Sequence, residues 1–186
     1  TEGLQVNRRS RGAPVDRTAT LLLARDRAGA WRGGLINFAI HGTTQPPANL
    51  AFSADVSGTI EQAVAAALQE RNGTASPPTL LFLNGALGDV SPARRNQAGA
   101  QRIAGEFADG VKQALESATP LDVKWTVQHA AVDLGAPYVS VKNCIRQDWL
   151  RWMAGGWMKV PLGQVVSRQA TLRLIRLGDV AFMTWP

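Results

Sequence analysis

The stretch that decides the fold reads Leu80-Leu-Phe-Leu-Asn-Gly-Ala-Leu-Gly-Asp-Val-Ser-Pro92. Its leading apolar residues predict a buried strand over 79–84 that runs into a polar loop with two glycines. Open α/β sheets usually build their sites at the carboxyl ends of such strands. The loop also carries a carboxylate at Asp89 and a hydroxyl at Ser91. This is therefore the region in which we expect a functional site.

Two amphipathic helices are expected around this strand, over 55–71 and 97–117. Their apolar residues recur at i+4 and share one face of each helix. These residues are Val56, Ile60, Val64 and Leu68, then Ile103, Phe107, Val111 and Leu115. Further strands are expected over 18–24, 34–41, 121–129, 169–176 and 180–185, with a short helix over 145–153. We expect 1–17 to be an irregular lead-in and 135–143 to be a loop. This order predicts an α/β fold in which a mixed β-sheet is layered with α-helices.

Composition narrows the class of protein. The chain has 186 residues, of which 45% are hydrophobic, and this suits one domain with its own core. The net charge of +6 comes mostly from scattered arginines, which favours a solvated basic surface. Attraction to an anionic membrane surface fits the same charge, and nucleic acid is not expected as a partner. The single cysteine, Cys144, excludes an internal disulfide. Because the chain starts at Thr1 and stops at Pro186 directly after a strand, we expect it to be a fragment.

A histidine at the end of a predicted strand is the first candidate for chemistry. His41 is followed by small polar residues, a position that suits a metal ligand or a general base. A hydrogen bond to loop backbone is the alternative for this ring. Asp55 opens a predicted helix, so it is expected to be an N-cap. It could also orient His41 through a hydrogen bond.

The loop after the central strand supplies the next candidates. Gly88-Asp89 predicts a turn, and Ser91 is a nucleophile, a donor to substrate or a cap for the next turn. The residues alone favour the cap, because no base lies nearby in the sequence. Arg8 is a group that could grip a carboxylate or a polarised carbonyl. Composition alone favours a solvated basic lead-in at that position.

Taken in order, four pieces of this chain resemble the catalytic region of the neutral/alkaline (non-lysosomal) ceramidases. They are Asn7-Arg8, Asn37-Phe-Ala-Ile-His41-Gly-Thr-Thr, Ser53-Ala-Asp55-Val-Ser-Gly58 and Asn84-Gly-Ala-Leu-Gly-Asp-Val-Ser-Pro92. The resemblance implies an amidase that cleaves the N-acyl bond of ceramide into fatty acid and sphingoid base. It makes residues 1–186 a single, incomplete part of a larger catalytic domain. It also implies a secreted or periplasmic location.

The resemblance further implies one zinc ion, held by two histidines, a glutamate and a tyrosine. His41 matches the second histidine, Ser91 the serine needed for activity, and Arg8 an arginine near the substrate amide. Asp55, Asp89 and Gly88 are expected either to contact the substrate or to hold the residues that contact it. The remaining zinc ligands are expected outside this chain, since Tyr138 does not match the tyrosine ligand. Alone, the chain is expected to bind little metal and to be inactive.

Other functions stay open on the sequence. The chain could be a related hydrolase of another amide or ester, or a non-catalytic module that binds lipid headgroups or a protein. Trp149, Trp152 and Trp157 suit a lipid-facing surface. They equally suit a surface covered by missing C-terminal segments, and the residues alone slightly favour that alternative.

Overall fold

The computed structural model describes residues 3–154, 156–163 and 166–184. The chain folds into two compact units, residues 1–118 and 119–186. The assignment of both units to one catalytic domain stays a prediction. The predicted α/β class is confirmed, because mixed sheets and helices alternate along the chain.

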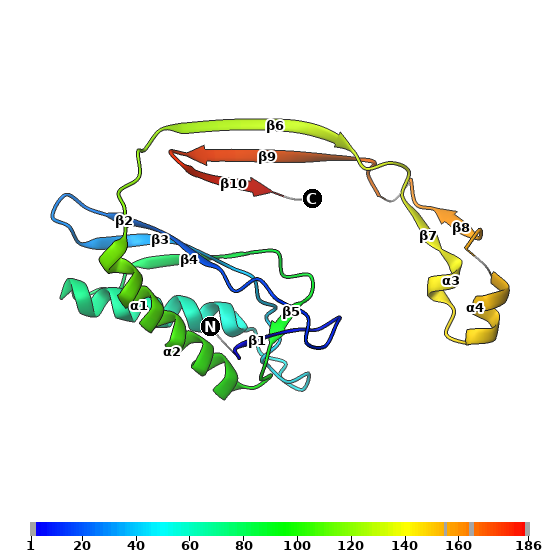
Figure 1. The fold of residues 1–186 in the computed structure, drawn as a ribbon, viewed down its shortest axis with the longest axis horizontal. Coiled ribbons are helices and arrows are strands. Elements are labelled where there is room, and N and C mark those ends of the chain that lie inside the picture. The colour runs from blue at the N-terminus through cyan, green and yellow to red at the C-terminus, as the bar shows by residue number, and fades with distance from the viewer. Residues whose placement is uncertain (1–2, 155, 164–165, 185–186) are drawn as a thin grey trace. The chain divides into compact units, whose positions relative to one another are not determined.

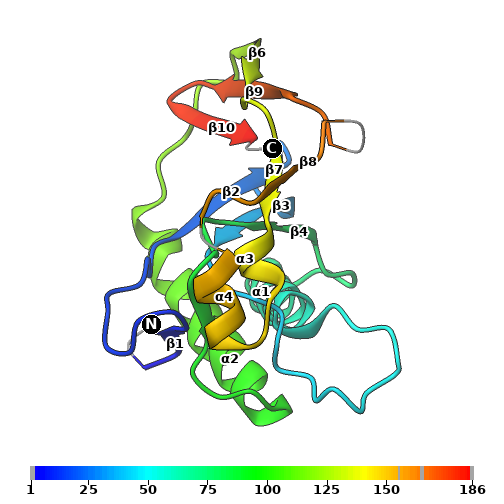
Figure 2. The ribbon, with the colours of Figure 1, turned by 90° about the vertical axis from the view of Figure 1, so that its right-hand side faces the viewer.

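The first unit is built on a mixed sheet. Its strands are β2 (Ala19–Arg25), β3 (Trp31–Phe38) and β4 (Thr79–Asn84), in the order β2-β3-β4. β2 pairs with β3 antiparallel, and β3 pairs with β4 parallel, with Phe38 opposite Asn84. Helices α1 (Asp55–Asn72) and α2 (Gln97–Ala114) lie on the same face of this sheet (Figure 1, Figure 2). The parallel pair places the ends of β3 and β4 at one edge, where the site is expected.

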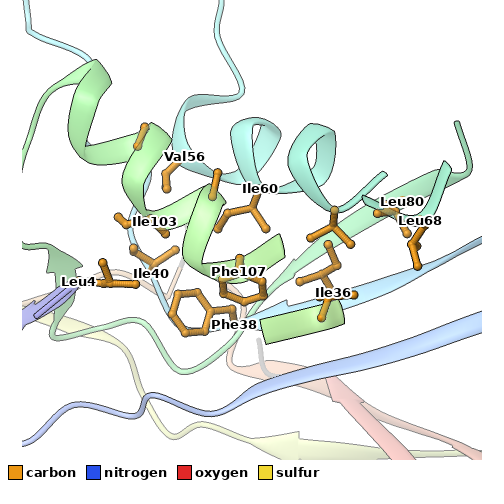
Figure 3. Packing of buried hydrophobic residues seen from close by; sticks show 14 of the residues in the cluster. Leu4, Ile36, Phe38, Ile40, Val56, Ile60, Leu68, Leu80, Ile103 and Phe107 are labelled. Atoms are coloured by element: carbon orange, nitrogen blue, oxygen red, sulfur yellow. The ribbon is translucent and has the colours of Figure 1, made fainter. Parts of the chain in front are cut away.

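The core of the first unit lies between the sheet and the two helices. Figure 3 shows Ile36 and Phe38 of β3 beneath Ile60 of α1 and Phe107 of α2, and these side chains are buried. The rings of Phe38 and Phe107 meet edge to face with centroids 4.8 Å apart. Each such side chain stabilises the fold by about 1.5–3 kcal/mol through burial. The core therefore fixes β3, and with it the segment that follows, against the helices.

Several predicted bounds are corrected in this unit. The strand predicted over 34–41 already ends at Phe38, so His41 follows the strand instead of closing it. The predicted irregular lead-in contains β1 (Gln5–Asn7), and the predicted loop contains β5 (Val90–Pro92). The helix predicted to Ser117 becomes 3-10 helix η1 over Leu115–Ser117. α1, by contrast, ends only one residue later than predicted, because Gly73 has a φ of 63° and its N–H bonds the Gln69 carbonyl.

The second unit has two pieces. One is the antiparallel sheet β10-β9-β6, formed by β6 (Trp125–Asp133), β9 (Gln169–Leu177) and β10 (Val180–Thr184). The other is the antiparallel pair β7 (Tyr138–Ser140) and β8 (Lys159–Pro161), with α3 (Val141–Cys144) and α4 (Asp148–Ala154) between them. The strand predicted over 121–129 lies four residues later, and the loop predicted over 135–143 contains β7 and the first three residues of α3. Trp185 and Pro186 lie outside the described residues.

Candidate functional site

The edge at the ends of β3 and β4 is closed by a tight backbone approach. The N–H of Gly85 donates to the carbonyl of Phe38 at 3.0 Å. A Cβ at Gly85 would lie 3.1 Å from the backbone nitrogen of Ala39. Only a residue without a side chain fits this approach without a shift of the neighbouring strand. Gly85 therefore starts the loop in contact with the segment that leads to His41.

The loop then turns, as the sequence predicts. The N–H of Val90 donates to the carbonyl of Leu87 at 3.0 Å, with Gly88 and Asp89 at the centre of the turn. Within residues 3–154, the N–H groups of Gly88 and Asp89 make no hydrogen bond. Gly88 is exposed and Asp89 is half-buried. The turn thus presents two consecutive N–H groups that an incoming anion or carbonyl oxygen can use.

The pairing of β1 with β5 brings the lead-in to this turn. Val6 lies opposite Ser91, and Asn7 lies opposite Val90. The N–H of Arg8 donates to the carbonyl of Asp89 at 2.7 Å. Nδ2 of Asn7 donates to Oδ2 of Asp89, also at 2.7 Å. Arg8 is exposed, so its backbone is fixed at the turn while its guanidinium stays in solvent.

His41 is tied to the same strand through its backbone and its ring. Its N–H donates to the carbonyl of Val90 at 3.2 Å, and ring Nδ1 lies 2.8 Å from that same oxygen. A carbonyl oxygen only accepts, so this contact is a hydrogen bond when Nδ1 carries the proton. In the neutral ring Nε2 is then the unprotonated nitrogen, which is the form that binds a metal or accepts a proton.

Asp55 organises the loop after His41 and is not the predicted N-cap. Ala54 occupies the N-cap position, and the hydroxyl of Ser53 accepts from the N–H of Asp55 at 3.0 Å. The Asp55 carboxylate accepts from the N–H and hydroxyl of Thr44 and from the N–H of Gln45, at 2.6–3.0 Å. Within the described part of the chain, no hydrogen bond joins Asp55 to His41.

The electrostatics of Asp55 follow from these donors. Burial raises the pKa of its carboxyl, but the hydrogen bonds from Thr44, Gln45 and the N–H of Val56 outweigh burial and hold the pKa below its ordinary value. The backbone of Asp55 has a φ of 50°, a left-handed conformation that Asp tolerates better than most residues. The carboxylate therefore holds a strained helix start against the loop that follows His41.

Ser91 differs from the other candidates because it is fully buried. Its exposed fraction is 0%, and no hydrogen-bond partner reaches Oγ from the described residues. The hydroxyl of Thr43, two positions after His41, is also buried without a partner. Buried polar atoms are nearly always paired, so such orphans need an explanation such as catalysis or a bound molecule. No described side chain is in place to take the proton of Ser91.

The structure thus gathers most of the predicted site residues on one short segment. His41, Arg8, Gly88 and Asp89 all bond to or lie within the turn and strand around Val90, next to Ser91. Sequence reasoning gave no role to Gln5, which is buried and donates from Nε2 to the carbonyl of Ala39 at 2.6 Å. A polar residue between Leu4 and Val6 carries no local signal for this contact.

These residues do not form a metal site by themselves. His41 has the ring orientation that a zinc ligand needs. Among residues 3–154, 156–163 and 166–184, however, no three His, Cys, Asp or Glu side chains gather in a group that could hold a metal ion. The described residues therefore fit zinc with one ligand and do not form a complete site.

The fold of the chain is similar to that of known structures. No protein-family model and no curated protein matches the chain. Among solved structures, a structure described as "Ceramidase complexed with C2" has a TM-score of 0.66 and 13% identity, and the match covers 98% of this chain and 40% of that one. The neutral ceramidase from Pseudomonas aeruginosa has a TM-score of 0.67 and 14% identity, covering 97% and 38%. The chain thus has the fold of a segment of the neutral ceramidases and spans about two fifths of their length.

Proposed function

We propose that the intact protein is an amide hydrolase that cleaves the N-acyl bond of ceramide or a related N-acyl lipid. The observation that carries the proposal is the carbonyl of Val90, which accepts from both the backbone and the ring of His41 beside the orphan hydroxyl of Ser91. The fold of a neutral ceramidase segment supports the same reaction class. This chain supplies only part of the site.

Zinc is the cofactor that the His41 geometry fits. The Val90 carbonyl fixes Nδ1, so Nε2 is free to be one ligand. When bound, zinc polarises an amide carbonyl and lowers the pKa of a bound water to about 7. One imidazole does not hold zinc with useful affinity, and the other ligands are expected from segments outside this chain.

The residues of this chain would bind and stabilise the reacting amide. The free N–H groups of Gly88 and Asp89 point to an anion-binding turn, and Arg8 is fixed one hydrogen bond away. Such donors stabilise the oxygen on which negative charge develops as the amide is attacked. The Arg8 guanidinium adds a permanent positive charge near the same turn. Asp55 acts at a distance, through the loop that follows His41.

Two routes to bond cleavage follow from these residues. In one, Oγ of Ser91 attacks the carbonyl carbon, and a base from outside the described residues passes its proton to the amide nitrogen. The C–N bond then breaks as the amine leaves, and a water hydrolyses the resulting acyl-enzyme to release the fatty acid. In the other, a water attacks and Ser91 donates a hydrogen bond to the substrate. Trapping an acyl group on Ser91 in the intact protein selects the first route. Retained hydrolysis in Ser91→Ala excludes it.

The decisive experiment measures zinc stoichiometry and fatty acid release by the intact protein. We expect His41→Ala to lose both, while the exposed His129→Ala loses neither. A panel of N-acyl lipids then separates ceramide from other amide and ester substrates. An intact protein that binds no zinc and is unaffected by His41→Ala is not a hydrolase of this type, and a non-catalytic binding module takes the place of the proposal.

A further inference from the structure

The second unit carries a small module that is rich in exposed aromatic side chains. It comprises residues 138–161, called here the tryptophan module, in which β7 and β8 pair and α3 contacts α4 (Figure 2). Among its described residues, the large apolar side chains are mostly exposed. These are Tyr138, Trp149, Trp152, Met153, Trp157 and Val160. A soluble protein rarely exposes so many of these side chains together without a partner for them.

The aromatic residues of α4 share one face of the helix. Trp149, Trp152 and Met153 stand at i, i+3 and i+4, and they are 64%, 83% and 61% exposed. Trp157, in the turn that follows, is 77% exposed. Leu150 is half-buried, so the side of α4 that is turned towards the rest of its unit carries Leu150 and not the tryptophans. The packing of α4 therefore does not use the face that carries the tryptophans.

The same module carries an excess of positive charge. The module contains four basic residues, Lys142, Arg146, Arg151 and Lys159, and one acidic residue, Asp148. All four basic side chains are exposed. Arg151 lies 3.5 Å from Asp148, and Nζ of Lys159 lies 4.1 Å from the centre of the Tyr138 ring. Aromatic and cationic groups are therefore combined on one short segment with an excess of positive charge.

We propose that the tryptophan module binds the interface of an anionic lipid bilayer. Tryptophan and tyrosine prefer the boundary between headgroups and acyl chains, where one end of the ring system is apolar and the other is wet. Lysine and arginine next to that boundary are attracted to anionic headgroups. Protein interfaces are also rich in aromatic residues, methionine and arginine, but they are depleted in lysine, and this module has two exposed lysines. The combination matches a lipid surface better than a protein partner.

The module would lie on the membrane and not cross it. No helix within the described residues is long and apolar enough to span a bilayer. An exposed helix with an aromatic face and flanking cations enters only the headgroup region. The proposal does not rest on the proposed hydrolysis, because binding of lipid vesicles needs neither zinc nor Ser91.

Vesicle sedimentation with the intact protein tests the proposal. We expect binding to phosphatidylcholine vesicles that contain about 30% phosphatidylglycerol to be roughly tenfold or more stronger than binding to phosphatidylcholine alone. Trp149→Ser combined with Trp152→Ser should reduce binding to the anionic vesicles at least about tenfold. Trp125→Ser is the matched control, since Trp125 is also 64% exposed but lies on β6. Brominated acyl chains should quench fluorescence of the wild type and of this control, and less so of the double variant.

Three results overturn the proposal. They are absence of binding to both vesicle types, equal loss in the control and the double variant, and binding that the double variant leaves unchanged. Hydrolysis of a detergent-dispersed short-chain amide, measured in parallel, shows whether the enzymatic proposal stands when the membrane proposal fails. The variants should fold like the wild type, because the substituted side chains are exposed. Circular dichroism checks this.

Discussion

Nδ2 of Asn7 donates a hydrogen bond to Oδ2 of Asp89 at 2.7 Å, across 82 positions of the chain. Oδ1 of the same amide accepts from the N–H groups of Arg9 and Ser10. One side chain thus shapes the bend after β1 and attaches it to the turn before β5. Arg8 lies inside this bend, so its position relative to Ser91 depends on Asn7.

Asn7→Ala should therefore lower the free energy of unfolding by about 1–3 kcal/mol, because a charge-assisted hydrogen bond and two backbone contacts are lost. Urea unfolding of the intact protein measures this change. Ser10→Ala is the control, as it removes only an exposed hydroxyl from the same bend. Equal stability of the two variants would contradict the role given to Asn7.

Asp55 should make stability depend on pH in the acid range. Its carboxyl has a lowered pKa in the folded protein, so the unfolded chain binds its proton first, near pH 3.9. The stabilisation is complete above that pH and is lost as the pH falls through the folded pKa. Asp55→Asn should lower stability at pH 7 by about 1–3 kcal/mol and flatten the acid dependence.

Asparagine is the informative substitution at this position because it also tolerates the left-handed backbone of Asp55. Any loss then reports on the carboxylate and not on the backbone. Asp148→Asn serves as the control, since its side chain is 97% exposed and makes only a surface ion pair. An unchanged acid dependence in Asp55→Asn would show that Thr44 and Gln45 do not stabilise the charge.

The two glycines of the loop should respond differently to alanine. A Cβ at Gly85 would lie 3.1 Å from Ala39 N and 3.2 Å from the carbonyl carbon of Phe38, whereas nothing lies within 4 Å of a Cβ at Gly88. Gly85→Ala should cost about 1–3 kcal/mol because β3 and the loop must separate. Gly88→Ala should stay within about 0.5 kcal/mol of the wild type. Urea unfolding of both variants is the measurement, and the reverse order would refute the close approach.

The elements that the sequence predicts well are those with a local cause. The strand over 79–84 has the predicted bounds, and α1 differs by one residue, because apolar periodicity and the Asn72-Gly73 stop signal lie within the segment itself. The tryptophans of α4 were also expected to form a surface for lipid or for other segments of the protein. Their spacing of three residues already places them on one face of the predicted helix, which begins three residues later than predicted, whereas their exposure needed the structure.

The elements that the sequence misses depend on contacts between distant residues. β1 and β5 have three residues each, which is too short for a period to be visible, and they are strands only because they pair with each other. Asp55 was expected to cap its own helix, but its carboxylate binds a loop ten and eleven positions away. The site residues themselves stay a prediction, and the pairing of β1 with β5 determines which of them lie together.

Substitution of Ser91 should affect hydrolysis without affecting the stability of the fold. Its buried hydroxyl has no partner, so Ser91→Ala removes an unsatisfied polar atom and should leave the free energy of unfolding within about 0.5 kcal/mol of the wild type, or raise it. Fatty acid release by the intact protein should nevertheless fall by about 100-fold or more if Oγ attacks or binds the substrate. Urea unfolding and hydrolysis are measured on the same preparation. A loss of stability above about 1.5 kcal/mol would mean that the hydroxyl is a structural group with a partner, whereas unchanged hydrolysis would remove Ser91 from the reaction altogether.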